Sequence, residues 1–356
     1  MDYRARQKKF ISAAEDAHVE GFLVTHLPNI RYLSGFTGSA GALAYARGRF
    51  AFFTDGRYRE QARQEVVGAT VVISKKPALT AAAEWLAGAR VRRVGVEAEH
   101  MTLAARTVAA RAVKVSLKPT AGLVECLRMV KEPAELECIR RAVQLGSSLF
   151  DTVVEAIRPG VSEASVAAEL EYAARAAGAE KMAFESIVAG GVHSAFPHWR
   201  ASSQPIPNTG FVVLDFGVIL AGYCSDMTRT VWVGKPDPAA RDLYQAVLEA
   251  QRAGLEAVRP GATTGEVDRA ARNMLRRAGL ARYFTHSTGH GVGLEIHEAP
   301  RLARGQTEVL RPGMVVTIEP GAYIPGKGGV RIEDMVAVTE SGHQVLTPTT
   351  KEFTSI

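Results

Sequence analysis

The sequence predicts an α+β protein of two domains, a smaller α/β domain followed by a larger domain of two duplicated α+β halves. The length of 356 residues suggests two domains rather than one. Strand and helix patterns alternate up to about residue 125, and the second part of the chain repeats a helix–turn–helix segment. We therefore expect an α/β domain over residues 1–125, a helical connection over 126–145 and the duplicated domain over 146–356.

The first domain contains short runs of β-branched and aromatic residues, which are typical of strands. These runs are GFLVTHL, RFAFFTD, TVVISK and RRVGVE. The alanine-rich segment ALTAAAEWLAGAR lies between them and has a helical pattern. Strands that alternate with a helix predict an α/β domain with a sheet of its own. In the long helical stretch that follows, Pro133 is typical of the first position of a helix.

The second part of the chain repeats itself. Residues 157–166, IRPGVSEASV, align without a gap with residues 258–267, VRPGATTGEV. Each copy has the pattern of a helix, an Arg-Pro-Gly turn, a second helix and then strands. Pro-Gly turns are common, but an ungapped match across a turn and a helix end favours duplication over coincidence.

The composition describes an ordinary folded protein and argues against nucleic-acid and membrane functions. No uninterrupted apolar run approaches the length of a membrane span. The net charge is +6, but Arg and Lys are scattered among acids, so we interpret them as a solvated surface rather than a nucleic-acid site. The three cysteines show no pairing or metal spacing, and the N-terminal segment has no signal-peptide pattern. We expect a cytoplasmic protein.

Two acids stand in the apolar, strand-like stretch VVLDFGVILAGYCSDMTRT, at Asp215 and Asp226. Their midpoint, 220.5, falls within ILAG, so a hairpin about this point sets the two carboxylates opposite each other on one face. Two such charges repel by about 3 kcal/mol at an effective dielectric constant of about 20. The hairpin therefore needs a countercharge.

A second hairpin repeats this pattern in MVVTIEPGAYIPGKGGVRIEDMVAVT. The midpoint of Glu319 and Glu333 is 326, within the loop IPGKGG. Between the hairpins, THSTGHGVGLEIHEAP contains His286, His290 and His297. Its glycines suit irregular backbone that closes on a site, which argues against the helical histidine motif of zinc proteases.

One histidine and four carboxylates form a hard, oxygen-rich set of protein ligands. A shared proton explains one pair of facing acids, but two pairs on related halves require a countercharge. The set favours two divalent metal ions per chain, with manganese first by ligand type and zinc, cobalt or iron left open. For a single residue the alternative is strong, because a lone buried histidine is more often structural and an acid at a strand end is usually solvated.

These motifs resemble those of the pita-bread metallopeptidases, the family of aminopeptidase P, prolidase, creatinase and methionine aminopeptidase. The motifs LDFG, GYCSDMTRT, HSTGHGVGLEIHE, IEPGAY and GVRIEDMV match in order, and the likeness covers nearly the whole chain. NIRYLSGFTGSAG and FFTDGRYREQA resemble the creatinase-type N-terminal domain, which methionine aminopeptidases lack. The resemblance implies a pita-bread domain with a curved antiparallel sheet, in the Xaa-Pro peptidase branch.

The resemblance also implies a role for each acid. Asp226 and Glu333 would bridge the two metals, Asp215 would complete one site, and His290 and Glu319 would complete the other. A water or hydroxide shared between the ions would be the nucleophile. Glu319 would also serve as general base and proton shuttle.

Further residues carry over in the same way. His198 in AFPHWR and His297 would contact the substrate carbonyl, and His286 would line the proline side. Arg331 would orient carboxylates from its position two residues before Glu333. Tyr323 would help similarly, with a core tyrosine as the alternative. Cys224, inside the motif, is interpreted as a small buried filler rather than a nucleophile.

The implied reaction is hydrolysis of the peptide bond before a penultimate proline. An Xaa-Pro bond is a tertiary amide with a fixed ring, so its peptidase needs metal-activated water and a pocket for the pyrrolidine. The enzyme would be an Xaa-Pro dipeptidase or an Xaa-Pro aminopeptidase, and the family favours homodimers. Arg301 and Arg304 lie near where prolidases place a cation for the proline carboxylate, although either suits a solvated loop equally well.

Two alternatives belong to other classes. Creatinase is a metal-free amidinohydrolase that shares both domains, and some pita-bread proteins are non-catalytic binding modules. The complete set of ligands argues against both, because neither needs it. Elemental analysis separates the classes, since the peptidase requires about two metal ions per chain.

Overall fold

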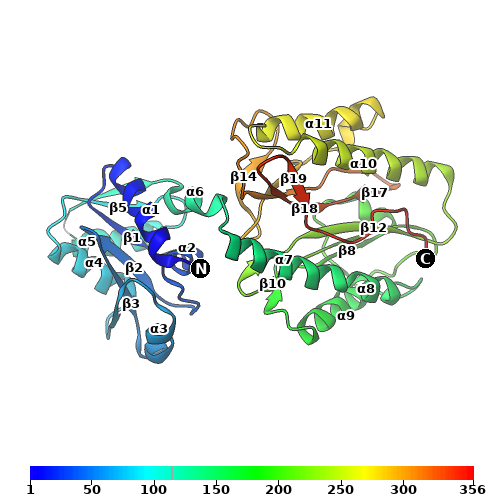
Figure 1. The fold of residues 1–356 in the computed structure, drawn as a ribbon. Coiled ribbons are helices and arrows are strands. Elements are labelled where there is room, and N and C mark those ends of the chain that lie inside the picture. Colours follow the sequence, from blue (N-terminus) through cyan, green and yellow to red (C-terminus); the bar gives the residue numbers. More distant parts are fainter. Residues whose placement is uncertain (114) are drawn as a thin grey trace. The chain divides into compact units, whose positions relative to one another are not determined.

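The computed structural model describes residues 1–113 and 115–356 and divides into two compact units, Met1–Arg128 and Met129–Ile356 (Figure 1). Each unit has its own sheets and its own hydrophobic core. Among the described residues, no helix combines the length and the apolar character needed to cross a membrane.

The first unit is built on a six-stranded mixed sheet with the strand order β4-β3-β2-β1-β5-β6. Its strands are β1 (Gly21–Val24), β2 (Ala42–Ala46), β3 (Arg49–Thr54), β4 (Thr70–Ile73), β5 (Arg93–Glu97) and β6 (Ser116–Thr120). The pairs β1–β2 and β2–β3 are antiparallel, and the outer pairs are parallel. Strands β1, β3, β4 and β5 lie in the predicted runs, whereas β2 and β6 were not predicted.

Helices cover both faces of this sheet. They are α1 (Tyr3–Asp16), α2 (Leu27–Ser34), α3 (Arg59–Glu65), α4 (Ala78–Gly88), α5 (Leu103–Val113) and α6 (Leu123–Met129). Successive residues of a strand point to opposite faces. Accordingly, Phe22 packs edge-on against Phe10 of α1, with ring centroids 5.4 Å apart, while Leu23 belongs to the cluster that includes Leu86 of α4.

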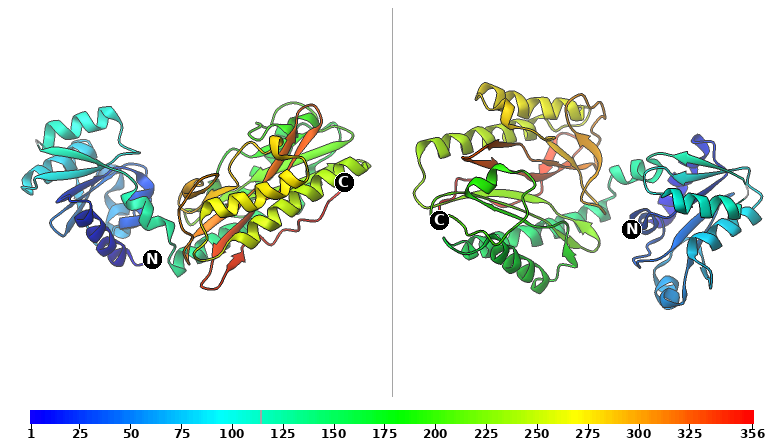
Figure 2. Two further views of the ribbon diagram at one scale, coloured as in Figure 1. Left: turned by 90° about the horizontal axis from the view of Figure 1, so that it is seen from above. Right: turned by 180° about the vertical axis from the view of Figure 1, so that it is seen from behind.

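The second unit has helices on the outside of its sheets (Figures 1 and 2). The helices are α7 (Pro133–Ser148), α8 (Phe150–Ala156), α9 (Glu163–Ala176), α10 (Pro238–Ala257) and α11 (Thr264–Arg277). Pro133 is the first residue of α7, as expected, and its N-cap Glu132 forms a capping box with Glu135. The predicted helical stretch is interrupted at Leu149, where α7 ends and α8 begins.

The sheets of the second unit carry the site. Their strand orders are β12-β9-β8, β14-β13-β15-β18-β19, β11-β10-β7 and β16-β17. The strands are β7 (Lys181–Met182), β8 (Ile187–Gly190), β9 (Gly210–Phe216), β10 (Val218–Leu220), β11 (Tyr223–Cys224), β12 (Met227–Val233), β13 (Gly289–Gly291), β14 (Glu298–Leu302), β15 (Val315–Ile318), β16 (Gly321–Ile324), β17 (Gly328–Arg331), β18 (Asp334–Val338) and β19 (His343–Val345).

The hydrogen bonds at the helix N-termini confirm the predicted duplication. In the first half, the N–H of Glu163 donates to the carbonyl of Gln204 over 3.0 Å. In the second half, the N–H of Thr264 donates to the carbonyl of Glu308 over 2.9 Å. The isolated bridges Ser162–Pro205 and Thr263–Val309 add the same pairing in each half. In each half, therefore, an equivalent loop crosses the N-terminus of the equivalent helix, α9 in the first half and α11 in the second.

The predicted register of the first hairpin is wrong by two residues. Asp215 lies opposite Thr228, not opposite Asp226. The reason is the turn, where Ala221 and Gly222 both adopt positive φ, of 50° and 78°. A two-residue turn of this kind is favoured in hairpins, and it moves the centre of the pairing beyond the predicted midpoint. A shift by two keeps every side chain on its face.

The second hairpin has the predicted register. Ile318 pairs with Asp334 and Gly321 pairs with Arg331. This register places Glu319 opposite Glu333, between the end of one ladder and the start of the next.

Candidate metal centre

A cavity of about 820 Å³ lies between the two halves of the second unit. Its lining includes most of the side chains that the sequence singled out. They are His198, Asp215, Asp226, His286, His290, His297, Glu319, Arg331 and Glu333. Residues from segments far apart in the chain thus meet around one space.

Three potential ligands converge most closely. Ligand atoms of Asp226, His290 and Glu333 all lie within 4.8 Å of one another. The Nε2 atom of His290 is 3.5 Å from Oδ2 of Asp226 and 3.5 Å from Oε1 of Glu319. These distances suit groups that share a cation better than groups that hydrogen-bond directly.

The backbone around His290 explains how it reaches this position. Strand β13 has an irregular register between His290 and Gly291. A Cβ atom at Gly289 would overlap the carbonyl of Thr317, so only glycine fits there. Nδ1–H of His290 donates to the Gly291 carbonyl over 3.0 Å, which leaves Nε2 with its lone pair directed to the carboxylates.

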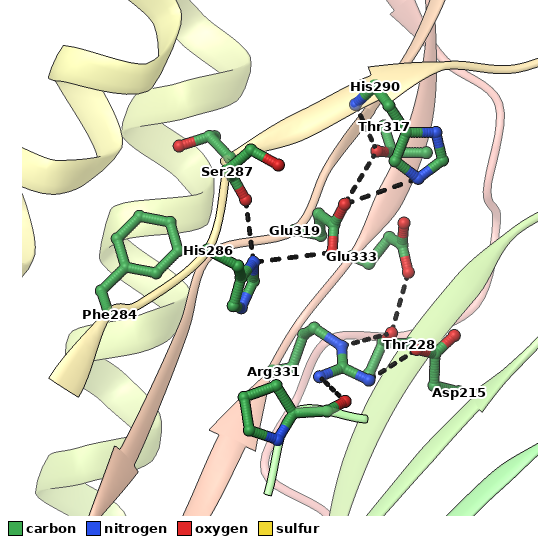
Figure 3. A network of polar contacts seen from close by, with 12 residues as sticks. Asp215, Thr228, Phe284, His286, Ser287, His290, Thr317, Glu319, Arg331 and Glu333 are labelled. Atoms are coloured by element: carbon green, nitrogen blue, oxygen red, sulfur yellow. Dashed lines mark hydrogen bonds and ion pairs between the residues drawn. The ribbon is translucent and has the colours of Figure 1, made fainter. Parts of the chain in front are cut away.

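Arg331 is the cation among these carboxylates (Figure 3). Its side chain is 4% exposed, and its Nη2 atom is 2.5 Å from Oδ2 of Asp215. Its Nε–H donates to Oγ1 of Thr228 over 3.1 Å, and that hydroxyl donates to Oε2 of Glu333 over 2.8 Å. One arginine and one threonine therefore orient acids from both hairpins.

If all of the buried acids were ionised, they would carry more negative charge than Arg331 balances. Burial raises the pKa of Glu319 to about 8. Burial also raises the pKa of Asp226 and of Glu333 well above the usual range, and the neighbouring carboxylates add to both shifts. Ionising this cluster requires additional positive charge. Divalent cations supply it, and the oxygen-rich donor set fits them.

His286 and His290 are held neutral. Burial lowers the pKa of His290 to about 4 and that of His286 to about 3. Nε2 of His286 is 2.8 Å from the hydroxyl of Tyr323, which also accepts a hydrogen bond from Nη1 of Arg331 over 2.7 Å. Tyr323 is thus buried beside the cavity, where it joins a histidine to the arginine.

Sequence reasoning missed two threonines. Thr228 contacts Glu333 as described, and Oγ1 of Thr317 lies 3.4 Å from Oε1 of Glu319. Each stands two residues from a predicted ligand, Asp226 or Glu319, and therefore on the same face of a strand. This spacing was the signal that could have revealed them.

The remaining residues that the sequence singled out are two arginines and a cysteine. Arg301 lines the cavity, whereas Arg304 lines a different one. Cys224 is buried, and burial raises the pKa of its thiol, so it is no activated nucleophile.

The duplicated α+β fold and the buried set of carboxylates around a neutral histidine are those of a metal-dependent hydrolase. The chain belongs to metallopeptidase family M24, whose family profile matches residues 137–340. A second profile, the creatinase/prolidase N-terminal domain, matches residues 6–130. The resemblance and the fold predicted from the sequence are confirmed, and the chain is a metallopeptidase.

Several relatives are similar over their full length. A solved structure of an Xaa-Pro dipeptidase from Bacillus anthracis has a TM-score of 0.97 and 41% identity, covering 100% of both chains. An Xaa-Pro dipeptidase of Pyrococcus horikoshii is 36% identical over 97% of each chain. The structure of an X-Pro aminopeptidase from Thermotoga maritima has a TM-score of 0.88 and 33% identity, covering 97% of this chain and 100% of that one.

Proposed function

We propose that this metallopeptidase hydrolyses the peptide bond before a proline at the second position of its substrate. The observation that carries the proposal is the convergence of Asp226, His290 and Glu333 from both halves on one cavity. The likeness to Xaa-Pro peptidases over nearly the whole chain supports the choice of substrate.

We propose that five residues hold two divalent ions, most readily manganese, with zinc, cobalt or iron as alternatives. Asp226 and Glu333 would serve both ions, Asp215 would serve one, and His290 and Glu319 would serve the other. When bound, the ions would supply a nucleophilic water at neutral pH and polarise the scissile carbonyl.

The chain's own residues handle the substrate and its proton. Glu319 lines the cavity beside His290, where its carboxylate could accept a proton from the attacking water and return it to the departing proline nitrogen. His198 and His297 line the cavity from opposite halves, and in this proposal they would contact the substrate carbonyl. His286, beside Tyr323, lines the wall for the pyrrolidine.

We propose a dipeptidase rather than a longer-peptide aminopeptidase. Arg301 lies opposite His290 in the β13–β14 pairing and lines the cavity. A guanidinium binds a carboxylate in a planar, bidentate way, so Arg301 would hold the free carboxylate of a C-terminal proline. An aminopeptidase would need open space there.

The test compares hydrolysis of an Xaa-Pro dipeptide with that of an Xaa-Pro-Yaa tripeptide, with and without manganese. We expect manganese-dependent cleavage that favours the dipeptide. Arg301→Leu should raise KM for the dipeptide at least about tenfold, since a charged hydrogen bond contributes about 1.5–3 kcal/mol. Arg304→Leu is the matched control and should change little. Equal loss in both variants, or a preference for the tripeptide, would contradict the dipeptidase assignment.

We also propose that the enzyme is a cytoplasmic homodimer, as the family pattern suggests. The molecular mass in solution at micromolar concentration tests the dimer, and a monomeric mass would count against it.

A further inference from the structure

Glu163, the first residue of α9, is a fully buried carboxylate. It lies at the point where a surface loop, residues 191–202, is anchored. It accepts hydrogen bonds from the N–H of Gly190 (2.9 Å) and from the N–H and hydroxyl of Ser202 (3.2 and 2.7 Å). The Nε1–H of Trp199 donates to it over 2.8 Å, and Nδ1 of His193 lies 2.8 Å away. One side chain thus collects donors from both ends and the middle of the loop.

This loop, residues 191–202, carries His198 and is called the His198 loop. From the cavity side, Nη1 of Arg331 donates to the carbonyl of Pro197 over 3.1 Å. No hydrogen bond to the side chain of His198 is found within the described part of the chain. The position of His198 therefore depends on how its loop is held, between Glu163 behind and Arg331 in front.

The contacts favour an ionised Glu163. Burial opposes ionisation, but the hydrogen bonds from Gly190, Ser202 and Trp199 hold the pKa of Glu163 below its usual range. The indole of Trp199 also stacks on the ring of His193, with centroids 4.0 Å apart and planes at 20°. Since Trp199 lines the same cavity as His198, the anchor reaches two parts of the wall.

Comparison of the two halves shows that the fold alone does not require this carboxylate. The residue that aligns with Glu163 in the second half is Thr264. The backbone N–H of Thr264 donates to the carbonyl of Glu308 in the equivalent loop of the second half. Its buried hydroxyl has no hydrogen-bond partner among the described residues. The carboxylate therefore belongs to the half that carries the His198 loop.

We propose that Glu163 is a positioning residue, which holds His198 and Trp199 in place at the cavity by binding their loop from behind. The inference rests on the proposed function, in which His198 contacts the substrate.

The kinetic test is a double-mutant cycle of Glu163→Gln and His198→Ala. Glutamine has the same size but replaces one acceptor oxygen by an NH₂ donor that faces the loop's own donors. We expect Glu163→Gln to lower kcat/KM for an Xaa-Pro dipeptide by about tenfold or more, at unchanged metal content. In the His198→Ala background the same change should cost no more than about twofold, because Glu163 acts through a residue already lost.

A second readout needs no activity. Hydrogen–deuterium exchange of residues 191–202 should be faster in Glu163→Gln, because an NH₂ group replaces one of the two oxygens that accept hydrogen bonds at the loop. Glu135→Gln is the matched control, since Glu135 is also a buried acid and accepts a hydrogen bond from Tyr223 over 2.9 Å. It should leave exchange in the His198 loop unchanged.

The outcomes separate the inference from the proposed function. Unchanged exchange in Glu163→Gln, or kinetic losses that multiply in the double variant, would overturn the positioning role. If the wild type cleaves no Xaa-Pro peptide, the proposed function fails, and the exchange result alone decides whether Glu163 holds the loop. If Glu163→Gln does not fold, Trp199→Phe, which keeps an aromatic ring but removes the indole donor to Glu163, should show faster exchange in the same loop. Unchanged exchange there would equally overturn the inference.

Discussion

At the scale of single residues, the centre combines acids that resist ionisation with one buried arginine. Arg331 contacts Asp215, Thr228, Tyr323 and the carbonyl of Pro197. It thereby fixes an acid of one hairpin, the hydroxyl that orients Glu333, and the loop of His198. A neutral side chain of similar size would leave these acceptors without a donor in a buried site, so arginine is required for its geometry as well as its charge.

Replacing a shared ligand should remove metal and activity together. In Asp226→Ala, one of the three most closely convergent ligands is lost, and we expect turnover to fall below detection and metal content to fall with it. Elemental analysis and peptide cleavage of the same sample measure both. Cys224→Ala is the control, because this buried neighbour should change stability only slightly and keep the metal. Full activity in Asp226→Ala would refute the bridging assignment.

Metal binding should release protons. In the metal-free protein at pH 6, the pKa of Glu319 near 8 keeps this acid largely protonated, and burial also raises the pKa of Asp226 and of Glu333. His290, with a pKa near 4, is already neutral and contributes no proton. Because bound carboxylates must be ionised, metal affinity should increase as the pH rises towards about 8.

Calorimetry in two buffers of different ionisation enthalpy counts the protons released. Fewer should be released from Glu319→Gln than from the wild type. Affinity that is constant between pH 6 and 8, or proton uptake, would contradict the charge balance described for the cluster.

At the scale of secondary-structure elements, the sequence predicted the hairpins but not every register. The spacing of Glu319 and Glu333 predicted the correct register of the second hairpin, because the pairing of its strands is centred on residue 326. The spacing of Asp215 and Asp226 predicted the wrong register, because Ala221 adopts a positive φ, which is uncommon for alanine and is not predicted from the sequence. The face of each strand survived the error, since a shift of two preserves the alternation.

A buried ion pair joins the start of the second unit to strand β14. Nζ of Lys131 is 3.2 Å from Oε2 of Glu298, with side chains 1% and 6% exposed. Lys131→Met would leave the Glu298 carboxylate buried without this ammonium, and we expect a loss of about 3–5 kcal/mol in the free energy of unfolding. Urea denaturation of the metal-free protein measures it.

The control for that change is an exposed pair in the first unit. Lys76 and Glu84 lie 2.7 Å apart with side chains 60% and 46% exposed, so Lys76→Met should cost less than about 1 kcal/mol. Equal costs for the two lysines would mean that burial of the Lys131 pair does not strengthen it.

At the scale of the whole molecule, duplication explains why the acids of the site could be predicted from the sequence. Each half contributes one hairpin with two acids, so spacing within each half located the acids, and the repeat related the two hairpins. The hydrogen bonds that support the site could not be predicted from the sequence. Glu163 binds its partners across sequence separations of 27 to 39 residues, and Thr228 binds Glu333 across 105 residues. Such contacts depend on how distant segments pack, within one half for Glu163 and between the halves for Thr228, which no local pattern encodes.

We propose that the chain uses two divalent ions to cleave an Xaa-Pro bond. The most direct measurement titrates manganese into metal-stripped protein and follows bound metal and dipeptide cleavage in the same samples. We expect cleavage to appear with the metal and to reach its maximum at about two ions per chain. Binding of no metal, or metal-loaded protein that leaves Xaa-Pro and Xaa-Pro-Yaa peptides intact, would contradict it.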